Sequence, residues 1–190
     1  FIRLVRGSGL RGLISLDKKN KKGLINLNRP LLDQKKSDLI FLSNKIFEFY
    51  IKDPSNEKDK FLRIKIRKLI FNLQKDGLDK NKLSMTIDNL KRSNNVIDFY
   101  VSENLEKNTF FSLKKDHLIL NKKFFQQPYE VVFRAFSDSI QFVGKKYYPA
   151  RGKKLDRIIS DIENDKVYKS TLGGCVIEKV NQTVIISREY

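Results

Sequence analysis

Residues 83–105 read LSMTIDNLKRSNNVIDFYVSENL, and this stretch sets the character of the fold. Its apolar side chains recur at intervals of three and four, with Asn94 in phase between them: Leu83, Ile87, Leu90, Ile97, Val101 and Leu105. This period predicts one long amphipathic helix. Packing of the apolar stripe into a core accounts for the pattern without any functional role.

Helices are expected on both sides of this segment. Asp33 or Ser37 is a candidate N-cap for one that carries Leu39, Leu42 and Ile46. The others cover the first five residues, 59–74 with Gly77 at its end, 129–143 with Pro128 in the first turn, and 153–163.

Strands are expected in two hairpins, 109–113 with 117–120 and 175–178 with 183–186, because β-branched and aromatic runs flank polar turns there. Residues 17–23 have the polar composition of a loop, with a short strand possible at 24–27. His117 is expected as an ordinary strand residue and Cys175 as a small buried one. The sequence therefore predicts a mainly helical α+β fold.

The composition favours a polyanionic partner. The 190 residues include 39 Lys and Arg against 22 Asp and Glu, a formal charge of +17, and most of the excess lies in the first half. The bias of an A/T-rich genome toward Lys codons would produce part of the same excess. Nucleic acid is the favoured partner, and charge alone does not decide it.

Cysteine and histidine usage limits the other possibilities. One Cys cannot form an internal disulfide, and one His with one Cys cannot build a zinc site, so no metal is expected. No apolar run approaches the roughly 20 residues that span a bilayer, and no signal-peptide pattern stands at the start. A cytoplasmic protein without membrane contact fits these features best.

Three segments carry the residue types of a phosphate or RNA contact. Arg6-Gly7-Ser8-Gly9 combines a cation with backbone that a ligand can approach closely, although a helix C-cap has the same pattern. One helix face carries three like charges, Arg63 and Arg67 with Lys60 one turn earlier. Their mutual repulsion would be offset by an anionic partner, and plain solvation of the face is the alternative. The stretch 145–154 mixes five cations with two tyrosines. This composition suits contacts to phosphates and stacking on an unpaired base, but a loop whose tyrosines pack back on the domain would have the same composition.

Taken in order, RLVRGSGLRGL (3–13), RPLLDQKKSDL (29–39), DPSNEKDKFLRIKIR (53–67), YYPARGKKL (147–155) and TLGGC (171–175) resemble the tRNA(Ile)-lysidine synthetase family of the N-type ATP pyrophosphatase superfamily. Many members carry Asn where this chain has Ile64. The resemblance implies an ATP-dependent ligase that uses ATP and Mg²⁺ to adenylate the wobble cytidine of tRNA(Ile), after which free lysine displaces AMP. A non-catalytic basic RNA-binding module is the alternative.

The resemblance also implies an organisation. The family's SGGxDS loop and HxxDDQxET helix are not among these residues, so we expect a C-terminal fragment that contains no catalytic residue, binds no ATP by itself and is inactive alone. Residues 1–75 would end a Rossmann-like α/β nucleotide-binding domain, and 76–190 would form a helical tRNA-binding domain with β-hairpins. Family members often dimerise, so a homodimer is possible.

Site roles follow from the same resemblance. Arg6, Gly7, Ser8 and Gly9 would border the ATP and lysine pocket. Asp53, Ser55 and Asn56 would orient the loop before Arg63, or form a plain turn and N-cap. The residues expected to bind tRNA are Lys60, Arg63, Arg67, Lys145, Lys146, Tyr148 and Arg151.

Overall fold

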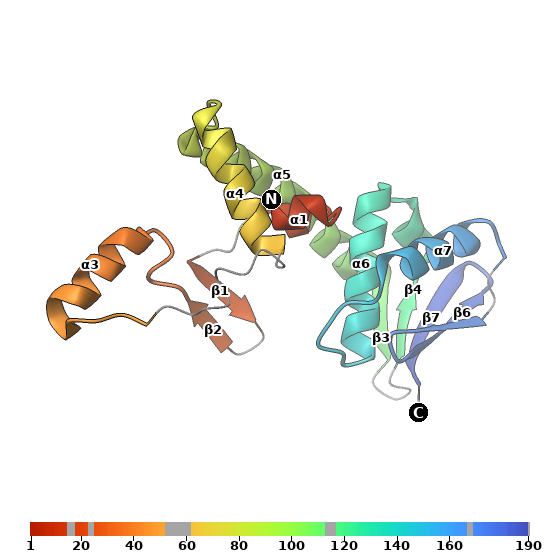
Figure 1. The fold of residues 1–190 in the computed structure, drawn as a ribbon. Coiled ribbons are helices and arrows are strands. Elements are labelled where there is room, and N and C mark those ends of the chain that lie inside the picture. Colours follow the sequence, from red (N-terminus) through yellow and green to blue (C-terminus); the bar gives the residue numbers. More distant parts are fainter. Residues whose placement is uncertain (15–17, 23–24, 52–61, 113–116, 167–168, 190) are drawn as a thin grey trace. The chain divides into compact units, whose positions relative to one another are not determined.

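The computed structural model describes residues 1–14, 18–22, 25–51, 62–112, 117–166 and 169–189 (Figure 1). These residues form helices and antiparallel strands, and they divide into two compact units, 1–92 and 93–190. The mainly helical α+β class predicted from the sequence is confirmed. Each unit is described by itself below.

The first unit begins with two short helices and a hairpin. Helices α1 (Ile2–Val5) and α2 (Leu10–Leu13) flank the turn that contains Gly7. Strand β1 (Lys19–Lys22) pairs antiparallel with β2 (Ile25–Asn28). The loop predicted for 17–23 is therefore wrong at residues 19–22, because backbone pairing with β2 forms a strand from a segment with no apolar residue.

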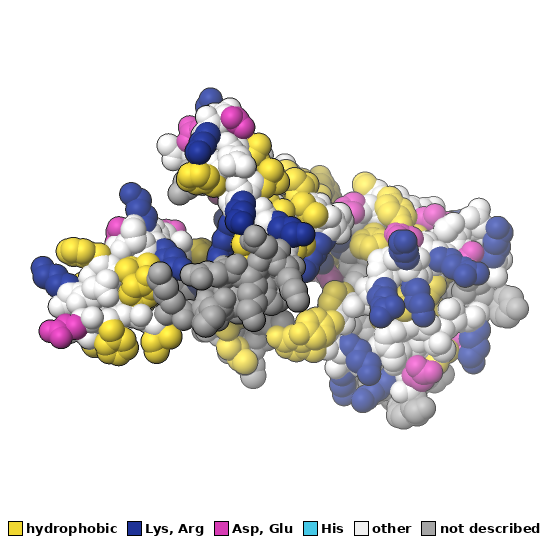
Figure 2. Space-filling view, viewed as in Figure 1, with side chains coloured by type: hydrophobic (Ala, Val, Ile, Leu, Met, Phe, Trp, Pro, Cys, Tyr) yellow, Lys and Arg dark blue, Asp and Glu magenta, His cyan; other side chains and the backbone are white. Residues whose placement is uncertain are grey.

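Helix α3 (Lys36–Phe47) starts after Lys35 and has no side-chain cap. The capping role predicted for Asp33 or Ser37 is wrong, since the Ser37 hydroxyl donates to the Asp38 carboxylate at 2.9 Å and the Asp33 carboxylate pairs with Lys18. None of its residues is buried, and apolar side chains project from several of its sides (Figure 2). Phe41 and Phe47 are about two-thirds exposed.

Helix α4 (Leu62–Lys75) ends where the sequence predicts. Gly77 has φ +102°, and the amides of Gly77 and Leu78 donate back to the carbonyls of Gln74 and Leu73. This pattern is the Schellman motif, which only a residue tolerant of positive φ completes without strain. Helix α5 (Lys80–Asn108) then confirms the single long helix predicted from the apolar period.

The second unit is built around a five-stranded antiparallel sheet with the order β3-β4-β7-β6-β5. Its strands are β3 (Thr109–Ser112), β4 (His117–Leu120), β5 (Lys169–Leu172), β6 (Cys175–Val180) and β7 (Thr183–Arg188). Both predicted hairpins are present, and pairing of β4 with β7 joins them into one sheet. Strand β5, at an edge, was not predicted.

One face of this sheet is packed under two helices, α6 (Tyr129–Val143) and α7 (Gly152–Glu163) (Figure 1). Burial alternates along β4, β6 and β7, as expected for a sheet covered on one side. The largest fully buried side chains of the core are Leu120, Phe124, Phe136, Ile140, Leu155, Ile159, Ile177 and Ile186. This core holds the loop between α6 and α7 and the turn between β5 and β6 in fixed positions.

Candidate nucleic-acid interface

The loop between α6 and α7 and the turn between β5 and β6 border one pocket of about 410 Å³. The loop supplies the cations Lys146 and Arg151 to the lining, and the first turn of α7 adds Lys154. The turn supplies Gly173 and Gly174. Two segments that 15 residues separate in the sequence, YYPARGKKL and TLGGC, thus meet at one site.

The glycine turn permits this close approach. Gly173 and Gly174 have φ of +64° and +77°, the pair of positive values that a two-residue type I′ hairpin requires. A Cβ on Gly173 would stand 2.7 Å from Cγ2 of Ile140. A Cβ on Gly174 would stand 2.8 Å from Cε of Lys146. Glycine at these positions therefore serves both the turn and the packing of the turn against α6 and the loop.

The loop itself is held by contacts to α6. Gly144 is buried, and a Cβ there would stand 2.4 Å from the carbonyl oxygen of Gly173. Lys145 follows with φ +51°, which turns the chain away from the helix axis. The Gln141 side-chain amide donates to the Tyr147 carbonyl at 3.0 Å. These contacts position the cations and tyrosines of the loop at the pocket.

The tyrosines of the loop face solvent. Tyr147 is 64% exposed and Tyr148 is 76% exposed, with their rings edge to face at a centroid distance of 4.7 Å. The alternative in which both pack back on the domain does not match this arrangement. An exposed ring next to Lys146 and Arg151 has the geometry for stacking on an unpaired base while the cations contact phosphates.

Lys145, Lys146, Tyr148 and Arg151, the residues predicted here, lie together, all exposed. Lys154, which was not named in the predicted set, also lines the pocket. The signal for it was present in the sequence as the second lysine of the quoted YYPARGKKL segment. Figure 2 shows Lys and Arg side chains gathered in several groups over the surface of residues 93–190.

In the first unit, Arg63 and Arg67 are exposed on α4, whereas Ile64 and Ile66 are buried. Neither guanidinium forms a salt bridge with another residue that the structure describes. Two cations one helical turn apart repel each other by roughly 0.2–0.5 kcal/mol. An anionic partner against this face would offset the repulsion.

The Arg6-Gly7-Ser8-Gly9 segment has the conformation of a helix cap. Gly7 has φ +67°, its amide donates to the Leu4 carbonyl, and the Ser8 amide donates to the Arg3 carbonyl, which completes a Schellman motif. A Cβ on Gly12 would stand 2.5 Å from Cβ of Ser8. Gly7 of this motif thus has a structural use, and the Arg6 side chain is exposed beside it.

Arg3 has a structural partner as well. Its guanidinium donates to the carbonyls of Gly12 and Ile14 at 2.8 and 3.3 Å and so holds the end of α2.

The predicted site residues Asp53, Ser55, Asn56 and Lys60 lie outside the described residues. Among the residues that are described, no three His, Cys, Asp or Glu side chains cluster as metal ligands. The helices within those ranges include none long and apolar enough to span a membrane.

Comparison with known protein families identifies the class of domain at the N-terminal end of the chain. Residues 1–74 match the family model of the PP-loop domain. This match covers the segment with the RGSG cap and all of α4 except its last residue.

Over its whole length the chain is homologous to proteins named tRNA(Ile)-lysidine synthase, which confirms the family resemblance of the quoted motifs. It is 30% identical over 202 residues to that of Orientia tsutsugamushi, and 27% identical over 200 residues to that of the Wolbachia symbiont of Brugia malayi. It is 28% identical over 196 residues to that of Wolbachia pipientis wMel. Each match covers 100% of this chain, and the chain spans 44% of the length of each relative.

Proposed function

We propose that this chain acts in an ATP-dependent, lysidine-forming modification of tRNA(Ile). In this reaction ATP adenylates the wobble cytidine with release of pyrophosphate, and free lysine then displaces AMP. The observation that carries the proposal is the cationic pocket with its exposed tyrosines in a chain homologous from end to end to tRNA(Ile)-lysidine synthases. Such a pocket suits an RNA loop whose bases are unpaired.

The proposed roles of the residues differ between the two units. In residues 93–190, Lys145, Lys146, Tyr148 and Arg151 contact the tRNA backbone and an unpaired base. In the first unit, Arg63 and Arg67, together with Lys60, neutralise further phosphates. Lysine and arginine contacts of this kind fix the orientation of an RNA and do not read its sequence.

The small-molecule substrates are assigned to the N-terminal part. We place ATP and lysine beside Arg6, Gly7, Ser8 and Gly9, and assign Asp53, Ser55 and Asn56 to orienting the loop before α4. The domain boundary predicted near residue 75 belongs to the same proposal. Mg²⁺ is part of the proposed reaction, but the described residues form no acidic cluster that would hold it, and no step is derived through it.

The test is transfer of radiolabelled lysine to a tRNA(Ile) transcript by the natural gene product that contains these 190 residues. We expect incorporation that requires ATP and releases pyrophosphate. A transcript with uridine in place of the wobble cytidine is the matched control and should take up no label. Sedimentation of the same preparation tests the predicted homodimer.

The alternative is a basic module that binds RNA without modifying it, and the charge of +17 is compatible with it. The same assay separates the two. Tight binding of tRNA with no transfer of lysine, under conditions in which a lysidine synthase of a relative is active, would overturn the ligase proposal and leave the binding module.

A further inference from the structure

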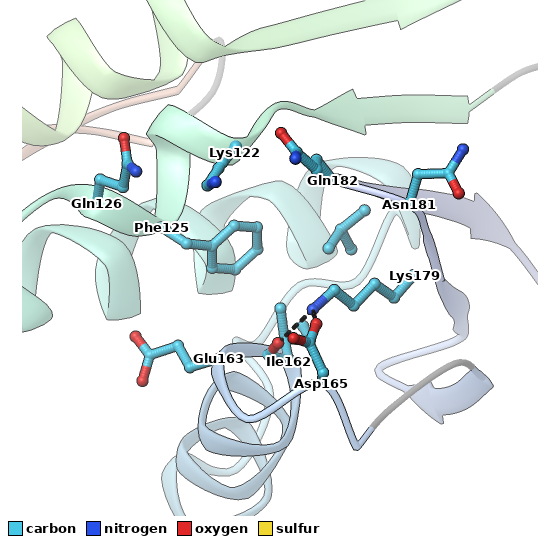
Figure 3. A pocket seen from close by; sticks show the side chains of 10 residues that line it. Lys122, Phe125, Gln126, Ile162, Glu163, Asp165, Lys179, Asn181 and Gln182 are labelled. Atoms are coloured by element: carbon cyan, nitrogen blue, oxygen red, sulfur yellow. Dashed lines mark hydrogen bonds and ion pairs between the residues drawn. The ribbon is translucent and has the colours of Figure 1, made fainter.

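We propose that the second unit carries another RNA contact, a lysine-lined groove between α5, the short helix η2 (Lys122–Gln126) and the turn between β6 and β7, which binds the sugar-phosphate backbone. The inference rests on the proposed function in one respect, since it assumes that RNA is the partner. It concerns residues that none of the sequence motifs includes. Two adjoining pockets form the groove, and Figure 3 shows the smaller of them.

The larger pocket has a volume of about 630 Å³ and a lining of hydrogen-bond donors. Its described lining residues are Lys107, Asn108, Asn121, Lys122, Lys123, Gln127, Gln182 and Thr183. None of these is acidic or apolar. Because each side chain carries an N–H or O–H group and three are cations, the pocket suits an anion and not an apolar small molecule.

Lys122 and Lys123 are the cations available to a ligand. Lys107 forms a salt bridge with Glu103 at 2.5 Å, which raises the pKa of the Lys107 ammonium group. Lys122 and Lys123 are exposed, and neither forms a salt bridge with a residue in the described part of the chain. After Lys179, the charge of Lys122 also lowers the pKa of the Asp165 carboxyl group, so part of the Lys122 charge is offset. Both lysines nevertheless line the larger pocket without a described salt bridge.

The smaller pocket, of about 330 Å³, shares Lys122 and Gln182 with the larger one and has a different chemistry. Phe125, Ile162 and Val184 give it apolar walls, and Figure 3 shows the Phe125 ring facing the cavity. Its acidic residues, Glu163 and Asp165, stand on the side of α7.

Lys179 is already compensated within the smaller pocket. Its ammonium group donates to the Ile162 carbonyl at 2.7 Å and to the Asp165 carboxylate. The hydrogen bond from Lys179 lowers the pKa of the Asp165 carboxyl group. Because the charge of Lys122 also lowers the pKa of Asp165, the excess positive charge lies toward Lys123 and the larger pocket.

Three asparagine amides, two of them buried, hold the backbone of these lysines in place. The Asn104 amide donates to the Phe124 carbonyl at 3.2 Å, and the Asn108 amide donates to Asn104 Oδ1 at 2.7 Å. The Asn121 amide donates to Asn108 Oδ1 at 3.3 Å, and Asn121 Oδ1 accepts from the Phe124 amide at 3.1 Å. Helix η2 is thereby fixed to the end of α5, so its two lysines need no backbone ordering on binding.

A donor-lined pocket next to one with apolar walls matches the alternation of phosphate and base along an RNA strand. Lysines contact phosphates as point charges, and such contacts release counterions. RNA is favoured over a free nucleotide because the two pockets adjoin and are lined from α5, η2, the β6–β7 turn and the end of α7, so that a strand can run across both. A free nucleotide remains an outcome of the test.

The experiment measures the affinity of the 190-residue chain for a fluorescent tRNA(Ile) transcript at several salt concentrations. K122A/K123A should make the plot of log K against log salt shallower by about 1.4–1.8 units, since each phosphate contact contributes about 0.7–0.9. K122R/K123R keeps both charges and should retain the parent slope. R157A/K169A removes two cations outside both pockets and is the charge-matched control.

Each result has one meaning. If R157A/K169A lowers the slope as much as K122A/K123A, net charge and not the groove accounts for binding, and the inference is wrong while the RNA partner stands. If the parent chain binds no RNA, the proposed function itself fails. A competition with 1 mM ATP or inorganic phosphate tests for a nucleotide or phosphate site. Equal displacement of RNA from the parent and from K122A/K123A would mean that the competitor acts outside the groove. Displacement from the parent alone would make the groove a nucleotide or phosphate site and overturn the RNA assignment.

Discussion

Replacement of Arg134 by Met should destabilise the second unit, because this arginine joins α5 to α6 through the core. Its side chain is 3% exposed. Nε donates to Glu130 at 2.7 Å, and Nη1 donates to Asn94 Oδ1 at 2.7 Å and to Asp98 at 3.1 Å. Methionine fills much of the same space but offers no donor.

The three partners contribute unequally to the expected loss. Glu130 and Asp98 are about half exposed, so water replaces the lost bonds, and each pair is worth only about 0.2–1 kcal/mol. Asn94 is 7% exposed, and an unsatisfied buried acceptor costs about 1–3 kcal/mol. Against this, Nη2 of Arg134 has no hydrogen-bond partner among the described residues, and its removal relieves a desolvation cost. We expect a net loss of about 2 kcal/mol.

Thermal unfolding of the full chain by circular dichroism measures this loss. For a unit of this size, about 2 kcal/mol corresponds to a fall in Tm of about 8–16 °C. Hydrogen exchange of peptides from residues 93–190 assigns the change to the second unit. R157A, which breaks an exposed pair on α7, is the control and should shift Tm much less.

The double variant N94L/R134M provides the decisive comparison. It removes the acceptor together with the donor, and replacing both partners by apolar groups is close to neutral. We expect it to recover most of the stability lost in R134M. An R134M protein with unchanged Tm, or a double variant no more stable than the single, would refute the assignment of the cost to Asn94.

Three further predictions concern the two units. R63A/R67A should make the salt slope of tRNA binding shallower by about two units at most with the fold intact by circular dichroism; an unchanged slope would leave this face merely solvated. G173A should lower Tm more than G7A, because both residues have positive φ but only Gly173 would place its Cβ 2.7 Å from a core side chain, and equal shifts would contradict this packing. Partial desolvation of the half-exposed Tyr129 side chain, and then its hydrogen bond to Asp156, raise the pKa of Tyr129 to about 12, so the folded state holds this proton more tightly than the unfolded state. The associated stability is present below pH 10 and is lost as the pH rises toward 12; ultraviolet titration of the parent and Y129F should show one tyrosine ionising late, and identical curves would refute it.

Much of the local structure could be read from the residues because it depends on neighbours in the chain. The apolar period in 83–105, the Gly77 helix end and the two hairpins each follow from interactions over a few residues. Strands β1 and β5 were not found because Lys19–Lys22 and Lys169–Leu172 lack apolar alternation and depend on a partner strand. The predicted caps of α3 failed because the Ser37 and Asp33 side chains have other partners.

The candidate site divides in the same way. The sequence by itself determined the helical periods and the positive charge, and it supplied the resemblance to lysidine synthetases and the candidate loop residues Lys145, Lys146, Tyr148 and Arg151. Only the tertiary structure decided that this loop meets the Gly173-Gly174 turn, that β4 pairs with β7, and that Lys122 and Lys123 face a groove with Gln182. The physical reason is that these contacts join residues far apart in the chain, whose approach is set by how the whole core packs and by no pattern within either segment.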